Sequence, residues 1–368
     1  MNLREFEGAL DRIAPLRFAE SWDNVGLLAG DRAANVARVL VTIDLTSAVL
    51  DEAVAASCDT VVAYHPVILK PVHRLARGHV LFDAIRAGVA VYCPHTALDA
   101  APGGTNDVLG DVLGMTERRP LRSHPGFADE VKLVTFVPEA DVEKVAAALG
   151  AAGAGVIGNY GACSFRTPGT GTFFGGEGAN PVVGTRGTLE RVPEIRLEMR
   201  APKRKLDAVV AALRASHPYE EPAFDLLAIT PHEPTSGMGR FGTIPEEPRE
   251  ALVERVLTGL GVASALVAGP RTGNVTRVAT CAGAGGDLLG DAVAKGAEVY
   301  LTGELRHHDA RVAEANGVTV IAALHSNSER AALGAYASAI RAGAPGVDVR
   351  VSTLDRDPFS IVTKGAPR

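Results

Sequence analysis

The sequence predicts an α/β fold in which a split doubly wound domain carries an inserted α+β domain. Short, continuously apolar runs alternate with helical segments in the first and last parts of the chain, which is typical of a parallel sheet covered on both faces. In the middle of the chain, apolar and polar residues alternate as they do in half-exposed strands. A length of 368 residues suits two or three domains. We therefore expect residues 1–125 and 233–368 to form one domain and residues 126–232 to form the other.

The composition is typical of a globular protein from a reducing compartment. Hydrophobic residues make up 46% of the chain and charged residues 22%. The net charge of −6 provides no general attraction to nucleic acid or to an anionic membrane. The four cysteines are scattered and contain no Cys-x-x-Cys pair, as expected of reduced thiols. We expect a cytoplasmic protein that binds neither membranes nor nucleic acid.

The first part of the chain alternates helices and strands. Apolar residues at helical spacing predict a helix from Leu3 to Ile13. In the next segment, Glu20 and Asp23 flank Trp22. The segment is either a loop anchored by the indole or a rim of acidic groups over a site. Strands are predicted at 39–43, 60–64 and 89–93, and helices at 47–56, 81–86 and 107–113.

The middle of the chain contains two strand–helix units. Strands are predicted at 131–138, 194–199 and 223–229, and helices at 141–149 and 206–215. This order, with half-exposed strands, predicts a ferredoxin-like α+β module. The glycine-rich stretch 158–178 is interpreted as hairpin turns, although such glycines can also surround a phosphate group.

The last part of the chain returns to alternating buried strands and helices. Strands are predicted at 275–281, 298–301, 318–323 and 347–351, and helices at 251–260, 288–295 and 328–336. The turn Gly283-Ala284-Gly285-Gly286-Asp287 is similar to a nucleotide-binding turn but lacks the third glycine of the G-x-G-x-x-G pattern. It is therefore weak evidence for a nucleotide site.

Imidazole and carboxylate groups follow four of the predicted strands. They are His65, then His95 with Asp99, then Glu304 with His307 and His308, and finally His325 with Glu329. For each histidine alone, a helix cap or a satisfied core position is the better explanation. The carboxyl ends of the strands share one rim of a doubly wound sheet, however, so the four groups are expected to lie together and to bind a cation. Mixed nitrogen and oxygen ligands suit zinc, iron or manganese better than calcium.

Several of these segments are motifs that carry a family resemblance. They are Tyr64-His65-Pro66, His95 to Asp99, Thr302 to His308 and His325 to Arg330, together with Trp22 to Leu27, Gly158 to Tyr160, His217 to Pro222, Asp355, and Asp357 to Phe359. In this order, over nearly the whole chain, the sequence resembles the Nif-three-like dinuclear metal-centre proteins, which are also labelled GTP cyclohydrolase I type 2 homologues. The Tyr-His-Pro and His-Ser-Asn-Ser-Glu-Arg motifs are similar to those of the eukaryotic-type branch.

The resemblance implies up to two divalent metal ions per chain, an inserted domain like the PII signalling proteins, and a toroidal homohexamer. The ligands that it implies are His65, Asp99, His325 and Glu329. Two neighbours of these ligands, His95 and Glu304, are candidates for catalytic proton transfer or for orienting the ligands.

One position departs from the family pattern. Tyr64 stands where bacterial members have a histidine. A phenol ionises only near pH ~10, so it is a poorer metal ligand than an imidazole.

Two functions follow from these observations. In the first, the protein is a metal-dependent hydrolase that acts on a purine nucleotide or a related heterocycle, with a water molecule activated by the metal. In the second, it is a non-enzymatic, oligomeric metal-binding or regulatory protein whose inserted domain senses a ligand or docks a partner.

Overall fold

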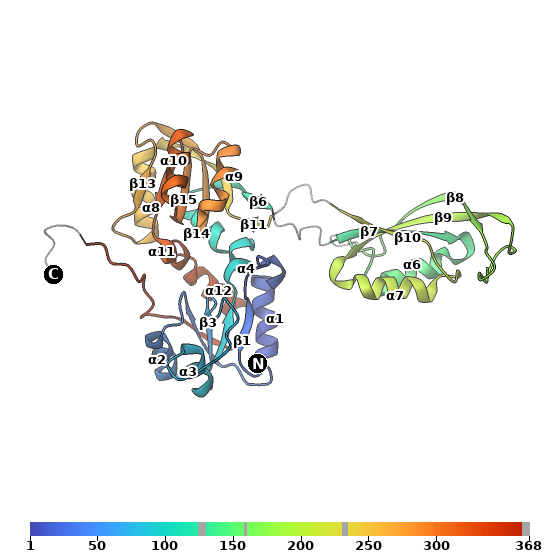
Figure 1. Ribbon diagram of the computed structural model, residues 1–368, viewed down its shortest axis with the longest axis horizontal. Helices are drawn as coiled ribbons and strands as arrows, with labels where there is room; N and C mark the ends of the chain where they lie inside the picture. The colour runs from blue at the N-terminus through green and yellow to red at the C-terminus, as the bar shows by residue number, and fades with distance from the viewer. Residues whose placement is uncertain (124–129, 158–159, 230–234, 363–368) are drawn as a thin grey trace. The chain divides into compact units, whose positions relative to one another are not determined.

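The computed structural model describes residues 1–123, 130–157, 160–229 and 235–362. The chain divides into two compact units, Met1–His124 with Glu233–Arg368 and Pro125–His232, which are called here the core unit and the inserted unit. Among the described residues, no helix is both long enough and apolar enough to cross a membrane. Figure 1 shows the elements of each unit along the chain.

The first sheet of the core unit has five strands. They are β1 (Gly26–Ala29), β2 (Arg38–Thr42), β3 (Thr60–Ala63), β4 (Ala90–Cys93) and β17 (Asp348–Val351), in the order β1-β4-β3-β2-β17. All pairings are parallel except that of β1 with β4. Its helices are α1 (Leu3–Ile13), α2 (Ser47–Ala55), α3 (Val80–Arg86) and α12 (Leu333–Gly343).

Both faces of this sheet are covered because its central strands are apolar throughout. Leu40, Val61 and Val91 pack in one cluster with buried residues of α2 and α3. The helix α1 packs instead against α12, which also contacts β2 and β17. The capping box of Asn2 and Glu5 fixes the start of α1.

The second sheet of the core unit has six strands. They are β5 (Thr116–Arg119), β12 (Arg240–Pro248), β13 (Leu266–Ala268), β14 (Asn274–Ala284), β15 (Val299–Glu304) and β16 (Thr319–Ala322), in the order β13-β16-β15-β14-β12-β5. Strands β14, β15 and β16 are parallel. The helices around it are α5 (Thr105–Val112), α8 (Arg249–Leu260), α9 (Leu289–Ala294) and α10 (His307–Ala315).

Successive residues of β15 point to opposite faces of this sheet. Leu301 packs in a cluster with Leu109 of α5 and Leu252 of α8. Tyr300 packs in the other cluster, with Leu289 of α9 and Ala313 of α10. Helices therefore cover both faces, as the continuously apolar strands require.

The expectation of one doubly wound sheet in this domain was wrong, because the described strands of the core unit form two large sheets and a separate two-stranded pair. The strands that end near His65 and His95 belong to the first sheet, whereas those that end near Glu304 and His325 belong to the second. The two arrangements have the same strand–helix alternation along the sequence, so hydrophobic periodicity cannot tell which strands pair. The four groups consequently do not share one rim.

The inserted unit is a four-stranded antiparallel sheet with two helices. Its elements follow the order β7 (Glu130–Pro138), α6 (Val142–Ala151), β8 (Phe165–Phe174), β9 (Leu189–Pro202), α7 (Leu206–Ser216) and β10 (Phe224–Ala228), and the strand order is β10-β7-β9-β8. The helices lie together on one face of the sheet (Figure 1). Leu133 and Leu197 from the sheet pack there against Val145 and Leu213 from the helices.

The strand β8 corrects the interpretation of the glycine-rich stretch as turns. Residues 158–159 of that stretch lie outside the described residues, but Phe165–Phe174 pairs with β9 over its whole length. Most of its residues are exposed because β8 is an edge strand. An exposed edge strand lacks the alternating burial by which a strand is recognised in a sequence.

The ends of the insertion indicate how it can be removed. The strand β6 (Arg122–Ser123) pairs in antiparallel register with β11 (Gly237–Met238), with Ser123 opposite Gly237. Replacing residues 124–236 by an Asn-Gly turn, which favours a two-residue hairpin, should give a soluble core unit that binds as much metal as the full chain. Melting curves and elemental analysis would test this. Aggregation, or a folded truncation without metal, would contradict it.

Candidate metal centre

His65, His325 and Glu329 come together although they belong to different sheets. His65 follows β3 of the first sheet, and the other two lie in α11 (His325–Arg330), which follows β16 of the second. One ligand atom from each lies within 4.8 Å of the others. Within the described part of the chain, this is the one group of three or more His, Cys, Asp or Glu residues with that spacing. The group could hold a metal ion.

The start of α11 is held by a short network of hydrogen bonds. The side chain of Asn327 donates to the Ala323 carbonyl oxygen at 3.0 Å, and Ser328 Oγ donates to the His325 carbonyl oxygen at 2.7 Å. Ser328 Oγ also accepts from the Gly283 backbone N–H at 2.9 Å. A second helix, α12, begins only at Leu333, so the single helix predicted over 328–336 is two helices.

The glycine-rich turn after β14 lies against this centre. Gly283 has φ +63°, and a Cβ atom there would lie 2.7 Å from Glu329 Oε1 and 3.2 Å from His325 Nε2. At Gly303, a Cβ atom would lie 2.8 Å from the His325 Cα atom. These two glycines allow the backbone to approach the centre closely. Gly283 therefore has a structural reason that does not involve a nucleotide.

Each imidazole of the group binds a carboxylate through Nδ1. His65 Nδ1 lies 2.9 Å from Asp44 Oδ1, and His325 Nδ1 lies 3.1 Å from Glu304 Oε1. Both Nε2 atoms therefore face Glu329, at 3.0 Å and 3.2 Å from its oxygens. A carboxylate on one ring nitrogen orients a metal-binding histidine and leaves the other nitrogen for the ion.

The charges at the centre are strongly coupled. Burial lowers the pKa of His65, but a hydrogen bond with Asp44 and the close carboxylate of Glu329 outweigh it and raise that pKa to about 10. The close carboxylate of Glu329 raises the pKa of His325 to about 9, against the effect of burial. Burial raises the pKa of Glu329, but the two histidines lower it overall. The buried carboxylate thus requires positive charge next to it.

One oxygen of Glu329 is better placed to bind a metal ion than to accept a hydrogen bond from a histidine. Glu329 Oε2 lies 3.0 Å from His65 Nε2, but the angles do not make a hydrogen bond, and this buried oxygen has no other hydrogen-bond partner among the described residues. Two imidazole nitrogens and one carboxylate form a donor set that suits zinc and other borderline divalent ions. The residues present therefore fit the metal that the sequence predicted.

Asp99 is not part of the group of three. It lies in α4 (His95–Ala100) and is buried, and Tyr64 donates its phenolic O–H to Asp99 Oδ1. Burial and the charge of Glu329 raise the pKa of Asp99 to about 6. Burial and the neighbouring carboxylates raise the pKa of Tyr64 well above its usual value, so this side chain is a neutral hydrogen-bond donor to Asp99. Asp99 as a ligand stays a prediction.

His95 is held beside the group by a carboxylate that the sequence suggested only as a rim residue. His95 Nδ1 lies 2.8 Å from Asp23 Oδ1, and Asp23 also accepts hydrogen bonds from Thr96. The His95 ring lies 5.5 Å from that of His65 and 6.0 Å from that of Trp22, centroid to centroid. Trp22 is 59% exposed, so it is not the buried anchor of its loop.

The remaining candidates occupy other positions. His307 and His308 are exposed at the start of α10 and contact one another, outside the group of three. Glu304 contacts His325, as described above. Asp44 was not among the residues expected from the sequence, because it lies in the loop before α2 and belongs to no recognisable motif.

The C-terminal segment fastens α11 to the first sheet. The carboxylate of Asp355 accepts hydrogen bonds from the Ile43 backbone N–H and from Arg330, both at 3.0 Å. Asp357 accepts from Ser326 at 2.7 Å. These contacts explain why two aspartates near the end of the chain belong to the motifs that carry the family resemblance.

The fold and the site define an α/β protein whose core unit has two large sheets and a candidate centre for a divalent metal. The model of the family Duf34/NIF3 (NGG1p interacting factor 3) matches residues 1–358, and the chain belongs to this family.

Its relatives match over nearly their whole length. The chain is 40% identical to the "GTP cyclohydrolase 1 type 2 homolog" of Mycobacterium tuberculosis, over 98% of this chain and 97% of the relative. It is 34% identical to the protein of that name from Bacillus subtilis, over 98% and 99%. A solved Bacillus cereus protein related to NIF3 is 33% identical, with a TM-score of 0.78, and covers 98% of this chain and 99% of its own. A Staphylococcus aureus structure is 27% identical, with a TM-score of 0.83 and the same coverage.

The contact between Tyr64 and Asp99 leads to a prediction about a second ion. Tyr64→His would replace a phenol that donates to Asp99 by an imidazole that can bind metal beside it. We expect two unequal affinities in the wild-type protein, with the weaker one at least ~10-fold tighter in the variant. Calorimetric titration of the metal-free protein with Zn²⁺ or Mn²⁺ would measure both.

A Tyr64→Phe variant is the control for this substitution, because it also removes the hydrogen bond to Asp99 but supplies no nitrogen. In Tyr64→Phe, the affinity of the weaker metal site should not rise above that of the wild-type protein. Two equally tight sites in the wild type, unchanged in Tyr64→His, would show that another ligand compensates for the tyrosine.

Proposed function

We propose that the protein is a metal-dependent hydrolase whose ion is held by His65, His325 and Glu329. The observation that supports this best is the convergence of two carboxylate-oriented Nε2 atoms on one buried glutamate. Two histidines and one glutamate are a common donor set of catalytic zinc sites, which leave a further position for water or substrate. When bound, the ion would supply Lewis-acid chemistry toward water and toward a carbonyl-type or phosphoryl oxygen.

His95 is the residue that we propose for proton transfer. Asp23 holds its Nδ1 hydrogen, which leaves Nε2 to accept a proton from water or to give one to a leaving group. Glu304 and Asp44 serve instead to orient His325 and His65.

We propose a purine nucleotide or a related heterocycle as the substrate. The name carried by the relatives, GTP cyclohydrolase 1 type 2 homolog, suggests this class. The exposed indole of Trp22 beside His95 supports it, because an aromatic surface at the rim of the site suits stacking on a planar base.

The assembly and the metal content extend this proposal. We propose a cytoplasmic homohexamer that holds up to two zinc, iron or manganese ions per chain, with Asp99 as a ligand of the second. All four cysteines are unpaired, which supports a reducing compartment. The order of elements in the inserted unit supports the PII-like, ferredoxin-like module that the sequence suggested.

A second function is favoured by a separate observation. The inserted unit contains a pocket lined wholly by its own residues. That arrangement suits a non-enzymatic, metal-binding regulatory protein in which the inserted unit senses a ligand.

Substitutions at the centre separate the two functions. His325→Ala should remove the bound metal, because it takes away one of three ligands. His95→Gln should keep the metal but lower the rate of nucleotide hydrolysis by about 10²–10⁴-fold, as expected for loss of a general base. Elemental analysis and a hydrolysis screen with GTP, ATP and their nucleosides would measure the two effects.

The control for this pair is His308→Ala, which removes an exposed histidine outside the group of three. Both metal content and rate should match the wild type. A metal-loaded protein that hydrolyses none of these compounds, or a His95→Gln variant with full activity, would favour the regulatory function.

The proposed assembly has its own test. Sedimentation at micromolar concentration should show a species near six times the mass of one 38.2 kDa chain. The measurement should be repeated with the core unit alone, because the two results show which unit carries the contacts. A monomeric full-length protein would contradict the hexamer.

A further inference from the structure

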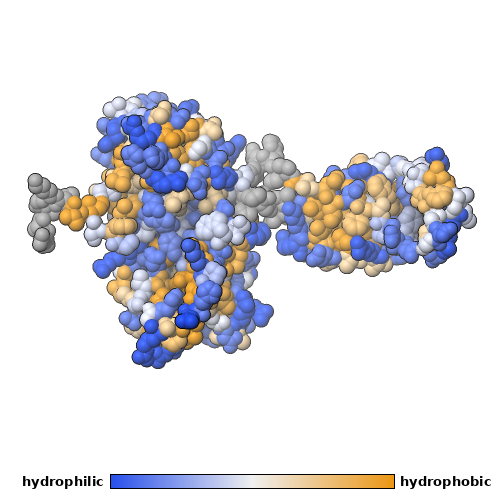
Figure 2. All heavy atoms as spheres, in the orientation of Figure 1, coloured by the Kyte–Doolittle hydropathy of each residue, from blue (hydrophilic) through white to orange (hydrophobic). Residues whose placement is uncertain are grey.

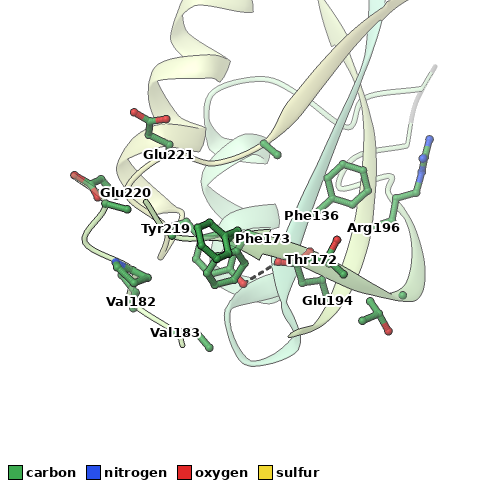
Figure 3. A pocket seen from close by; sticks show the side chains of 18 of the residues that line it. Phe136, Thr172, Phe173, Val182, Val183, Glu194, Arg196, Tyr219, Glu220 and Glu221 are labelled. Carbon is green, nitrogen blue, oxygen red and sulfur yellow. Dashed lines mark hydrogen bonds between the residues drawn. The ribbon is translucent and has the colours of Figure 1, made fainter. Parts of the chain in front are cut away.

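The inserted unit contains a pocket of about 830 Å³ that the metal centre does not use. It lies along β8 and β9 and is bordered by residues of the segments 175–183 and 219–223. Phe136, Phe173 and Tyr219 supply aromatic surface, and Val182 and Val183 add aliphatic surface (Figure 3). The volume falls within the range of small-molecule sites, roughly 300–1,000 Å³. Figure 2 shows hydrophobic side chains next to polar ones on the visible face of this unit.

A buried carboxylate lies in the wall of this pocket. Glu194 on β9 is only 8% exposed, and its Oε1 accepts a hydrogen bond of 2.8 Å from the Tyr219 hydroxyl. Its Oε2 has no hydrogen-bond partner among the residues that the structure describes. This oxygen is not completely buried, so a ligand can reach it. The carboxylate lies over Gly171, where a Cβ atom would come within 2.0 Å of Oε2.

Tyr219 is itself held in place. Its backbone N–H donates to His217 Nδ1 at 3.0 Å, and His217 Nε2 lies 3.0 Å from the carbonyl oxygen of Phe136. Burial lowers the pKa of His217, so the ring is neutral and donates from Nε2. The motif from His217 to Pro222, which has no role in the metal centre, thus positions the phenol on Glu194.

The charge of the lining is negative. Glu194, Glu220 and Glu221 supply three carboxylates, against the single guanidinium of Arg196. That guanidinium is already paired with Glu198 at 2.8 Å. Among the described residues only the Tyr219 hydroxyl binds the Glu194 carboxylate, so its Oε2 can accept a hydrogen bond from a positively charged ligand.

We propose that this pocket binds a small organic cation of the amine or amidine class, with its positive group on Glu194 and its apolar body against Phe173 and Tyr219. A cation supplies N–H donors to Oε2 and is attracted by aromatic faces. A contact between a cation and an aromatic ring is already present in this sheet, because the Arg196 guanidinium lies 5.9 Å from the centre of the Phe136 ring.

Two other ligand classes fit less well. The rings of Phe173 and Tyr219 are inclined by 59° with centroids 6.4 Å apart, so they do not form the parallel walls that would stack on both faces of a planar base. An inorganic cation would need converging ligand atoms. Within the described residues, the three carboxylates of the lining are not among the side chains that group within 4.8 Å.

The test uses the full chain and benzamidine as the cationic probe, with neutral benzamide as a probe of nearly the same shape. Calorimetric titration should show benzamidine binding at least ~10-fold more tightly than benzamide. Glu194→Gln should remove this preference, because the shape stays and the charge is lost. Gly171→Ala should also weaken benzamidine binding and reduce the preference for benzamidine over benzamide, because the added methyl displaces the Glu194 carboxylate.

The matched control is Gly176→Ala, because a Cβ atom there meets nothing within 4 Å. It should bind benzamidine as the wild type does, and circular dichroism should show all variants folded. Should Gly171→Ala fail to fold, Glu194→Gln decides alone. Equal binding of benzamide and benzamidine, unchanged binding in Glu194→Gln, or no binding of benzamidine at millimolar concentration would each overturn the proposal. None of these outcomes bears on the metal centre, which lies in the other unit.

Discussion

The core unit is organised around the buried carboxylate of Glu329. An ionised carboxylate loses its hydration inside a protein, at a cost of several kcal/mol unless positive charge or strong hydrogen bonds replace it. Here the compensation comes from His65 and His325, which belong to different sheets. The ends of β3 and β16 must therefore stay together for Glu329 to be tolerated. The close glycine contacts at Gly283 and Gly303 follow from the same requirement.

Further carboxylates orient the two imidazoles at that glutamate and a third imidazole that lies beside His65. Asp44, Glu304 and Asp23 each bind the Nδ1 atom of one histidine. Each ring thus presents its Nε2 atom in a defined direction, which is the arrangement that metal ligation or proton transfer requires. The loops that carry these acids come from distant parts of the sequence. The centre is consequently a property of the whole core unit and not of any one motif.

The sequence could predict those parts of the site that depend on local geometry. The spacing of His325 and Glu329 by one helical turn placed two candidate ligands together, because α11 is a helix. His65 was found because it follows a buried strand. Asp44 could not be found, since its contact with His65 depends on how two loops meet. The second sheet was missed for a similar reason, because strand pairing leaves no trace in hydrophobic periodicity.

The two units each contain a buried glutamate, and the comparison shows why their chemistry should differ. Glu329 faces two imidazoles whose Nδ1 atoms are bound to carboxylates, so the nitrogen and oxygen donors converge as a metal requires. Glu194 faces one neutral phenol and aromatic rings, with no second metal-binding group at similar distance among the described residues. Carboxylates of equal formal charge are therefore expected to select different cations. The first selects by converging donor atoms, and the second by aromatic surface and a single hydrogen-bond acceptor.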